Sequence, residues 1–431
     1  MPSGGRVRPG RPFSPANSKR GLFMRPVEIK PGVFWVGAVD WESYDFHGYA
    51  ISPRGTTYNA YCLKGDKITV FDTVKESHKD EYFCNVANVA GGLENVDYMV
   101  VNHLEPDHSG CLVEAVERMK PEKIYVSKMG VKSLARIHHK GKEDWPIEVC
   151  ESGTEVDLGG HTMQFLETRM LHWPDNMATY LPGSKLLISS DAFGQNWATS
   201  ERFVDEVDRP TLEHLLGEYF ANIVQPYSPI VIKTLDKLAE LNLDVDMIAP
   251  DHGLIYRTKE DCAWVMDRYR EYATAKPTKR ALIIYDTMWY ATEQMAHSIA
   301  DGLKEEGVDV RVMHLKQHHH STVMTELLRS GAVCMGSPTH NNGILPSVAG
   351  MMQYMKGLKP QNKVAGVFGS FGWSGESVKV LREWAESMNM DVVDDPVKVQ
   401  YQPTHDDAKT CFEYGKKIAQ SLKEKIAGFE G

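Results

Sequence analysis

The sequence predicts an α/β protein of two domains, with sheets sandwiched between helices in the first half and a doubly wound parallel sheet in the second. Three observations support this prediction. The chain has 431 residues, which is too long for one ordinary core. Short apolar runs alternate with helical stretches in both halves. A polar stretch that contains Pro277, Tyr272–Arg280, separates the halves. We therefore expect a disordered N-terminal extension over 1–24 and domains over 25–275 and 276–431.

The first half holds continuous apolar runs of the length of a strand, which are typical of strands buried on both faces. Helical stretches lie between them, so this half favours sheets covered by helices. Helices are expected over Leu112–Met119 and Pro229–Leu241. The expected strands are Lys67–Asp72, Asp97–Val101, Lys123–Ser127, Thr162–Leu166, Lys185–Ser189 and Asp246–Ala249.

In the second half, five apolar runs alternate with helical stretches. This pattern is typical of a doubly wound parallel sheet, which binds ligands beyond the carboxyl ends of its strands. The expected strands are Ala281–Tyr285, Asp309–Met313, Ala332–Gly336, Val364–Phe368 and Asp391–Val393. The expected helices are Glu293–Glu306, Val348–Gly357, Ser377–Met388 and Asp406–Ala427.

Composition excludes several classes of protein. No apolar run approaches the roughly 20 residues that cross a bilayer, so we expect no membrane span. A net charge of -10 argues against a nucleic-acid partner. The seven cysteines are scattered and never spaced as C-x-x-C, which indicates a reducing, cytoplasmic compartment. Met1–Met24 has no apolar core and is no secretory signal, and Met24 is an alternative start.

Four metal-ligating side chains crowd into a short stretch directly after an expected strand: His103, Glu105, Asp107 and His108. Imidazoles and carboxylates this close repel or titrate one another unless a cation lies between them, and the mixture suits iron, manganese or zinc. Three more candidates follow later strands: His172, Asp191 and His252. Loops on one rim of a sheet can converge on one point, so these residues predict a shared metal site. The clusters His138–His139 and His318–His320 are interpreted as solvated or supporting residues.

Three polar loops follow strands of the second half: Asp286–Thr292, Gly336–Gly343 and Gly369–Gly375. The first opens a helix, where hydroxyls, backbone N–H groups and the helix dipole can bind a phosphate without lysine. The chain has neither G-x-x-x-x-G-K nor G-x-G-x-x-G, which argues against a nucleotide triphosphatase and a dinucleotide fold.

The first loop resembles the phosphate loop of flavodoxins, and the resemblance implies FMN. Thr287 and Thr292 are then the expected hydroxyl donors, Trp373 is the expected stacking partner of the ring, and Trp289 is the alternative. The full set of expected FMN contacts is Thr287, Met288, Trp289, Tyr290, Ala291, Thr292, Pro338, Thr339, His340, Asn341, Asn342, Gly343, Ser370, Phe371, Gly372, Trp373 and Gly375.

The order H-x-E-x-D-H, then His, Asp and His, resembles the metallo-β-lactamase superfamily, whose hydrolases usually carry His where this chain has Glu105. Carboxylate in place of imidazole favours iron over zinc, and with the flavodoxin-like half the chain resembles the flavodiiron proteins. The resemblance implies an αββα sandwich followed by a flavodoxin-like domain, and two irons bridged by Asp191. One iron would bind His103, Glu105 and His172, and the other Asp107 and His252. Whether His108 is a ligand stays open.

The same resemblance implies the reaction: reduction of dioxygen to water, or of nitric oxide to nitrous oxide, with electrons that pass through FMN. Met170–Asp175 and Ser337–Pro346 resemble most the oxygen-reducing members that take electrons from rubredoxin. We therefore favour dioxygen as substrate and rubredoxin as donor, with another one-electron donor or a deazaflavin as alternatives. The family pairs its chains head to tail, which implies a homodimer, or a tetramer built from it.

Two other hypotheses remain open from the sequence. One is a dinuclear zinc hydrolase fused to a flavodoxin domain, in which the metal activates water. The other is an electron-transfer module whose metal pocket has lost its function. Metal analysis distinguishes these two hypotheses from the flavodiiron hypothesis, because the flavodiiron hypothesis predicts iron, the hydrolase zinc and the electron-transfer module no metal.

Overall fold

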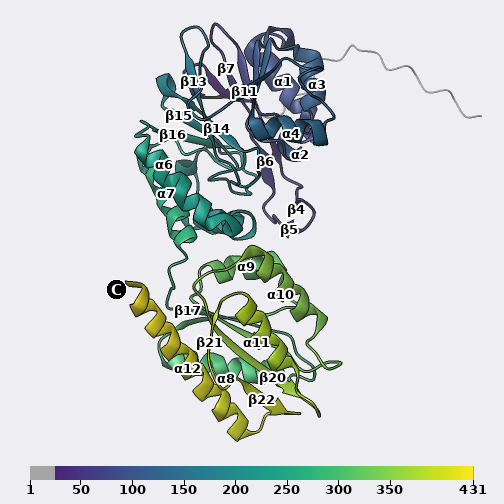
Figure 1. Ribbon diagram of the computed structural model, residues 1–431, viewed down its shortest axis with the longest axis vertical. Coiled ribbons are helices and arrows are strands. Elements are labelled where there is room, and N and C mark those ends of the chain that lie inside the picture. Colours follow the sequence, from purple (N-terminus) through teal and green to yellow (C-terminus); the bar gives the residue numbers. More distant parts are fainter. Residues whose placement is uncertain (1–24, 431) are drawn as a thin grey trace, which may run out of the picture.

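The structure is a computed structural model that describes residues 25–430. The expected N-terminal extension, 1–24, lies outside the described residues. Figure 1 shows two bodies joined by one connector, which runs between helix α7 (Lys259–Thr274) and strand β17 (Arg280–Tyr285). This position supports domain limits of 25–275 and 276–431, which we keep as a proposal.

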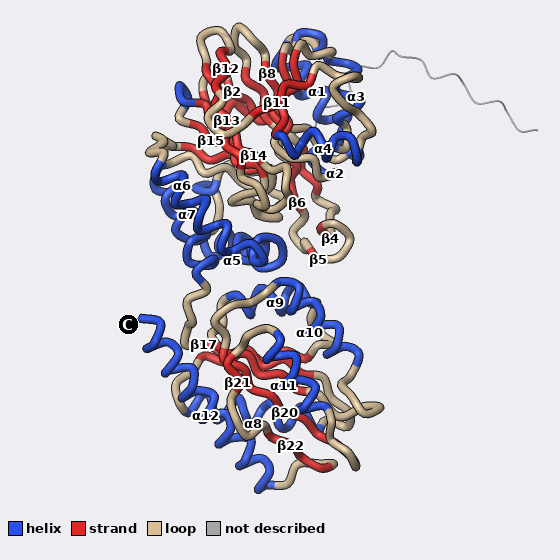
Figure 2. The backbone as a smooth tube through the Cα atoms, viewed as in Figure 1, coloured by secondary structure: helices blue, strands red, loops and turns tan. Residues whose placement is uncertain are grey.

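The N-terminal domain contains two main sheets, drawn in red in Figure 2. The seven-stranded sheet has the order β1 (Val27–Lys30), β2 (Val33–Trp35), β7 (Tyr61–Leu63), β8 (Thr69–Phe71), β9 (Tyr98–Val101), β10 (Lys123–Ser127) and β11 (Ile147–Cys150). The five-stranded sheet has the order β12 (Glu155–Asp157), β13 (Thr162–Glu167), β14 (Met177–Leu181), β15 (Leu186–Ser190) and β16 (Met247–Pro250). Two small ribbons pair β3 (Ala38–Asp40) with β6 (Thr56–Tyr58), and β4 (Asp45–Phe46) with β5 (Ala50–Ile51).

The two main sheets pack face to face, and helices cover their outer faces. Trp35 and Phe71 of one sheet meet Phe165 and Ile188 of the other in a fully buried core. Helices α1, α3 and α4 lie on the outside of the larger sheet, and α5, α6 and α7 on the outside of the smaller one. The layers therefore follow the order αββα. Besides α7, the helices of this domain are α1 (Lys79–Ala90), α2 (Pro106–Ser109), α3 (Leu112–Met119), α4 (Lys128–Ile137), α5 (Arg209–Tyr219) and α6 (Ser228–Glu240). Short 3-10 helices span Glu76–His78, Leu93–Asn95, Pro182–Ser184, Val204–Glu206 and Gln225–Tyr227, and a π-helical segment spans Phe220–Val224.

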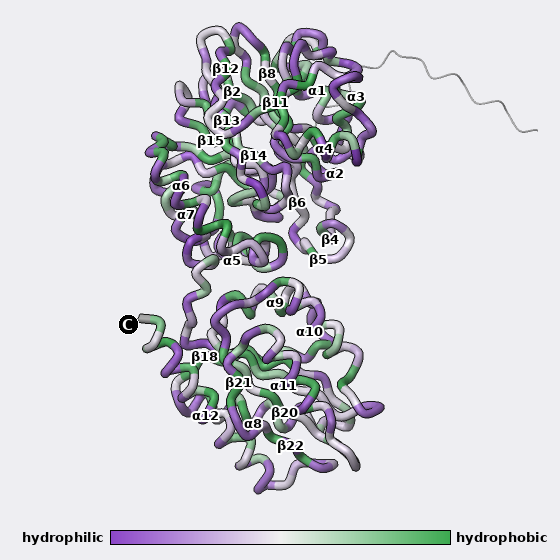
Figure 3. Tube along the Cα trace, in the orientation of Figure 1, coloured by the Kyte–Doolittle hydropathy of each residue, from purple (hydrophilic) through white to green (hydrophobic). Residues whose placement is uncertain are grey.

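The C-terminal domain is a parallel sheet with helices on both faces. Its strand order is β18-β17-β19-β20-β21, with β22 also paired to β20, which is the flavodoxin-like arrangement. Helices α8 and α12 cover one face and α9, α10 and α11 the other, so hydrophobic residues concentrate along the central strands in Figure 3. The elements are β18 (Asp309–His314), β19 (Ala332–Gly336), β20 (Val364–Phe371), β21 (Asp391–Val392), β22 (Val397–Gln400), α8 (Ala291–Glu305), α9 (His320–Leu328), α10 (Pro346–Leu358), α11 (Ser377–Ser387) and α12 (His405–Glu430).

The expected strands and helices are all present, with shifts of a few residues at their ends. The largest shifts concern two ends. β20 continues to Phe371 rather than ending at Phe368, because β22 pairs with its last residues, and the last helix continues to Glu430 rather than ending at Ala427. None of the helices within the described residues is both long and apolar enough to cross a membrane.

The domains contact each other through polar groups. Tyr354 of α10 donates a hydrogen bond to Asn222 Oδ1 at 2.9 Å, and the Asn222 amide donates to Ser321 O at 3.2 Å. Arg329 donates to Glu213 O at 3.1 Å. Among the described residues, the hydrogen bonds between the domains do not involve the three loops expected to bind FMN. In Figure 1, β20, which leads into the third loop, and β22 lie in the half of the C-terminal domain that is farther from the N-terminal domain.

Candidate metal centre and cofactor loops

The metal candidates gather where parallel strands of both sheets end. β8 pairs in parallel with β9, and β15 with β16, so the carboxyl ends of each pair lie at a common rim. Ser190 has a left-handed backbone, with φ of 56°, which turns the chain at the end of β15. Gly253 has φ of 78°, and a Cβ there would lie 1.8 Å from Gln195 Oε1, so only glycine fits this turn. The two sheets thus present their loops to one point.

Each expected ligand has a defined place on this rim. His103 follows β9, Asp191 follows β15 directly, and His252 follows β16. Glu105 caps the short helix α2, whose first residue is proline, and α2 carries Asp107 and His108. His172 differs from the expectation of a strand end. It lies in a separate turn beyond β13, which hydrogen bonds such as Met170 N to Trp173 O close.

One group of possible ligands contains His103, Glu105, His172 and Asp191, whose ligand atoms all lie within 4.8 Å of one another. Nε2 of His103 lies 3.3 Å from Glu105 Oε2 and 3.3 Å from Asp191 Oδ2. Nε2 of His172 lies 3.0 Å and 3.1 Å from the same two oxygens. Two imidazoles therefore face two carboxylate oxygens around one small volume.

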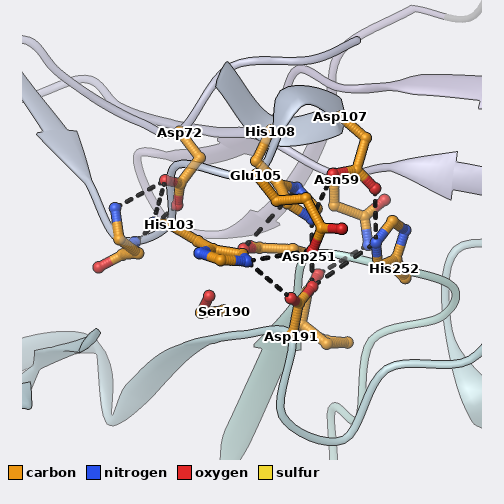
Figure 4. A network of polar contacts seen from close by, with 12 residues as sticks. Asn59, Asp72, His103, Glu105, Asp107, His108, Ser190, Asp191, Asp251 and His252 are labelled. Atoms are coloured by element: carbon orange, nitrogen blue, oxygen red, sulfur yellow. Dashed lines mark hydrogen bonds and ion pairs between the residues drawn. The ribbon is translucent and has the colours of Figure 1, made fainter. Parts of the chain in front are cut away.

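A second group contains Asp107, His108 and His252. Nε2 of His252 lies 3.3 Å from Asp107 Oδ2, and Nε2 of His108 lies 3.5 Å from Asp107 Oδ1. Both histidines also approach the other Asp191 oxygen, Oδ1, at 3.5 Å and 3.1 Å. Asp191 thus directs one oxygen to each group, as Figure 4 shows between His103 and His252. The geometry also places His108 among the possible ligands.

The fit of these residues to metal ions rests on buried polar atoms that have no hydrogen-bond partner. A buried nitrogen or oxygen without a partner is costly in a folded protein. Here such atoms cluster at one point and belong to residues with the donor types that bind iron or zinc. They are Asp107 Oδ1, both ring nitrogens of His108, His172 Nε2, both Asp191 carboxylate oxygens, His252 Nε2 and, beside His108, both carboxylate oxygens of Asp251.

Residues behind the site fix the orientation of the imidazoles, and the sequence reasoning missed them. Asp175 Oδ2 lies 3.0 Å from His103 Nδ1 and also accepts the backbone N–H of Leu104. Thr57 O lies 2.7 Å from His252 Nδ1. Such partners hold a metal-binding imidazole in the tautomer that leaves Nε2 free. Asp175 follows His172 within three residues, and that proximity was the available signal.

Charges around the site shift several pKa values in the metal-free chain. Burial by itself disfavours protonated His103, but hydrogen bonds to Asp175 and Glu105 outweigh burial and raise its pKa to about 10. Burial opposes protonation of His172 too, but Asp191 and Glu105 raise its pKa to about 9. Burial would raise the pKa of Asp191, but the charge of His108 and the neighbouring imidazoles of His172 and His103 hold that pKa well below the usual range.

These shifts predict that metal uptake releases protons. His103 and His172 are protonated at pH 7 in the metal-free chain, because their pKa values are about 10 and 9, whereas a metal binds neutral imidazole. Raising the pH from 7 towards 9 removes competing protons, so the apparent metal affinity should rise. Titrating Fe²⁺ anaerobically into the metal-free chain, with calorimetry in buffers of different ionisation enthalpy, measures the protons released. A heat independent of the buffer would contradict the shifts.

The phosphate loop expected in the C-terminal domain follows β17 and leads into α8, which begins at Ala291 rather than Glu293. Thr287 is buried, and its Oγ1 has no hydrogen-bond partner. Thr292 Oγ1 lies 3.0 Å from Ser370 Oγ, which connects this loop to the one after β20. A buried hydroxyl without a partner at a helix N-terminus fits a phosphate ligand.

The other expected FMN residues lie at the same edge of the sheet. Thr339 N donates to Ser370 O at 2.8 Å, which holds the second and third loops together. His340 and Gly343 exchange backbone hydrogen bonds, and Asn341 and Asn342 between them have left-handed backbones. The remaining residues of the set fall in these three loops, which come together as the parallel topology predicts: Met288, Tyr290, Ala291, Pro338, Phe371, Gly372 and Gly375.

Large aromatic side chains project from this edge. Trp289 is 82% exposed and Trp373 87% exposed, so both have free faces on which a flat ring could stack. A fourth loop, after β22, was missed: Tyr401 is 64% exposed, and Gln402 Nε2 donates to Trp289 O at 2.9 Å. The alternating pattern of Val397–Gln400 was the signal for this extra strand. The histidine clusters lie elsewhere: His138 meets Ser109, and His320 stacks on Tyr49.

The chain matches two protein families. Residues 57–253 match the ODP family beta lactamase, and residues 283–415 match Flavodoxin. It is 48% identical to the rubredoxin-oxygen oxidoreductase of Megalodesulfovibrio gigas, over 94% of this chain and 100% of the relative. It is 39% identical to the nitric oxide reductase of Moorella thermoacetica, over 93% of this chain and 100% of the relative.

Solved structures show a similarity to the same kind of protein. The rubredoxin oxygen:oxidoreductase from the anaerobe Desulfovibrio gigas superposes with a TM-score of 0.92 at 48% identity, and covers 94% of this chain and 100% of its own. The flavodiiron protein from Giardia intestinalis superposes with a TM-score of 0.89 at 29% identity, and covers 95% and 99%. The similarity therefore extends through both domains.

Proposed function

This chain belongs to the flavodiiron protein family, and from that premise we propose that it is an oxidoreductase that reduces dioxygen to water, nitric oxide to nitrous oxide, or both. Its domains are a metallo-β-lactamase-like αββα sandwich and a flavodoxin domain. Its cofactors are FMN and a pair of iron ions. We favour dioxygen, because the relative that matches at 48% identity is named an oxygen oxidoreductase, whereas the nitric oxide reductase matches at 39%.

One observation carries the proposal: a carboxylate, Asp191, offers one oxygen to each of two groups of imidazoles and carboxylates. We propose that His103, Glu105 and His172 would hold one iron and Asp107, His252 and His108 the other, and that Asp191 would contribute one carboxylate oxygen to each group. When bound, the iron pair and FMN supply the redox chemistry, namely electron uptake from a donor and delivery to a diatomic substrate.

The chain's own residues prepare this pocket. The ligand side chains are at most 14% exposed, so bulk water has little access to them. Asp175 and Thr57 O hold the imidazoles of His103 and His252 with Nε2 directed inward. Asp191 carries negative charge between the groups, which favours cations in a buried site.

The zinc hydrolase is not favoured. Glu105 supplies a carboxylate where zinc hydrolases of this superfamily usually have His, and the relatives reported above are named as oxidoreductases. The same names argue against a module that has lost its enzymatic function. We propose rubredoxin as the electron donor, which the name of the relative at 48% identity supports. The seven unpaired cysteines support our proposal of a cytoplasmic location.

We propose further that two chains associate head to tail. The amino end of the C-terminal sheet lies beside the N-terminal domain, since Arg329 binds Glu213 there. The FMN loops lie at the other end of strands such as β17, whose six residues span about 20 Å. Within one chain the flavin therefore faces away from the iron pair, and a partner's metal site is the one it can reach.

The test mixes the reduced protein anaerobically with dioxygen and, separately, with nitric oxide in a stopped-flow instrument, alongside iron, zinc and FMN analysis. We expect two irons and one FMN per chain, and faster reoxidation by dioxygen than by nitric oxide. Two zincs per chain together with esterase or lactamase activity would instead support the hydrolase. Sedimentation at working concentration tests the dimer, which a fully active monomer would rule out.

A further inference from the structure

Asp286, a carboxylate that no role above uses, is the buried first residue of the phosphate loop. It is 1% exposed and follows β17 directly. Its Oδ1 accepts the backbone N–H of Thr287 at 2.7 Å and lies 3.0 Å from His314 Nε2. Its Oδ2 accepts a short hydrogen bond from Ser347 Oγ. One carboxylate thus joins the ends of β17 and β18 to the start of α10.

These contacts decide which groups of the loop remain available to a ligand. Because the Thr287 N–H donates to Asp286, it is not free for a phosphate. The Thr287 hydroxyl is buried and has no partner. Ser347 lies in the first turn of α10, directly after the loop that begins at Gly336. The carboxylate therefore sets the position of Thr287 relative to a second cofactor loop.

A buried anion at this place needs compensation, because a phosphate ligand carries negative charge as well. His314 lies 3.0 Å from the carboxylate and Lys316 Nζ lies 3.5 Å from it. The His314 ring stacks on Tyr285 at 5.1 Å with an interplanar angle of 9°. Burial would raise the pKa of Asp286, but the hydrogen bonds from Ser347 and His314 and the charge of Lys316 lower it, so the group is ionised at neutral pH.

We propose that Asp286 is a positioning residue that shapes the first loop for the phosphate end of FMN, that His314 and Ser347 hold its carboxylate by hydrogen bonds, and that Lys316 offsets its charge. This inference rests on FMN being the cofactor of the C-terminal domain. The inference divides flavin binding between two sets of residues. The exposed aromatic side chains would bind the ring, whereas Asp286 with its partners Ser347, His314 and Lys316 would affect only the binding of the phosphate.

The experiment compares FMN with riboflavin, which has the same ring and no phosphate. The full-length chain is freed of flavin and titrated with each by fluorescence quenching. Losing hydrogen bonds to a buried charge typically weakens binding by roughly tenfold to a hundredfold. We expect Asp286→Ala to weaken FMN binding by that factor and to leave riboflavin binding unchanged. Asp286→Asn, which keeps an oxygen for Thr287 N–H, should weaken FMN less.

Two further variants test the charge. Lys316→Gln should weaken FMN severalfold without affecting riboflavin. Lys304→Gln is the matched control: it removes a lysine of similar exposure, 59% against 63%, that also lies 3.5 Å from an aspartate, at the other end of α8. Should Asp286→Ala fail to fold, the isosteric Asp286→Asn decides.

The outcomes are distinguishable. The inference would be overturned if the ratio of FMN affinity to riboflavin affinity stays at the wild-type value in Asp286→Asn and Lys316→Gln, or if the affinities for both ligands fall equally. A wild-type chain that binds neither flavin would instead overturn the proposed function.

Discussion

Replacing Asp191 by alanine is expected to reduce bound iron to less than one ion per chain and to lower the turnover of dioxygen by more than about a hundredfold. Changes to residues that only support a ligand already cost roughly tenfold to a hundredfold in metal affinity. Among the described residues, Asp191 is the carboxylate whose two oxygens face the two groups of ligands, so its loss should affect both irons. Iron analysis by mass spectrometry and oxygen consumption with a saturating donor measure the two effects.

The control for this variant is Asp244→Ala, which removes an exposed aspartate beside β16 that pairs with Lys185 and Lys259. It should keep full iron content and activity. Asp191→Ala should retain FMN, because the flavin loops belong to the other domain. An Asp191→Ala protein that retains both irons would contradict the proposed role of Asp191 as a ligand shared by the two irons.

Exchanging Glu105 for histidine is expected to change the metal preference from iron to zinc. The substitution gives the first group three imidazoles and removes one negative charge, and imidazole-rich sites suit zinc. Glu105 Oε2 lies within 3.3 Å of His103 and His172, so an imidazole at this position would face the same ion. Cultures supplied with equal iron and zinc should give a protein with mostly zinc, full FMN and almost no turnover of dioxygen.

Glu105→Asp is the matched variant, because it keeps the carboxylate and shortens its reach. It should hold more iron than Glu105→His under the same growth conditions. If Glu105→His keeps its iron and reduces dioxygen at the wild-type rate, the carboxylate at this position does not select the metal.

The sequence was sufficient for elements that carry a strong local pattern. β10, α3 and β19 have the bounds expected from it, because buried strands and amphipathic helices show their period directly. Metal candidates such as His103, Asp191 and His252 could be named for a similar reason: they follow strands, and parallel strands bring their carboxyl ends together. The topology that brings them together came from the family resemblance, since residues as distant as His103 and His252 share no local signal.

Other features depend mainly on tertiary contacts, even where a short stretch carries a local signal, such as the alternation in Val397–Gln400 or the position of Asp175 near His172. Strands of three residues such as β2 and β6 are defined by their partners. Asp175 becomes important only because the fold brings it to His103, and Asp286 only because Ser347 and His314 converge on it. Tyr401 reaches the flavin edge because β22 pairs with the end of β20. Residues of this kind are found by geometry rather than by pattern.

The placement of the flavin loops away from their own metal site has a consequence for mixtures of defective chains. A chain without Asp191 would still offer a working flavin edge, and a chain with a damaged flavin edge would still offer a working metal site. In the proposed head-to-tail dimer, each variant would be inert with itself, but a pair of the two would contain one complete reaction unit. Random pairing of equal amounts would then restore about a quarter of the wild-type activity. Such complementation between dead subunits has no counterpart in an enzyme whose centres communicate within one chain.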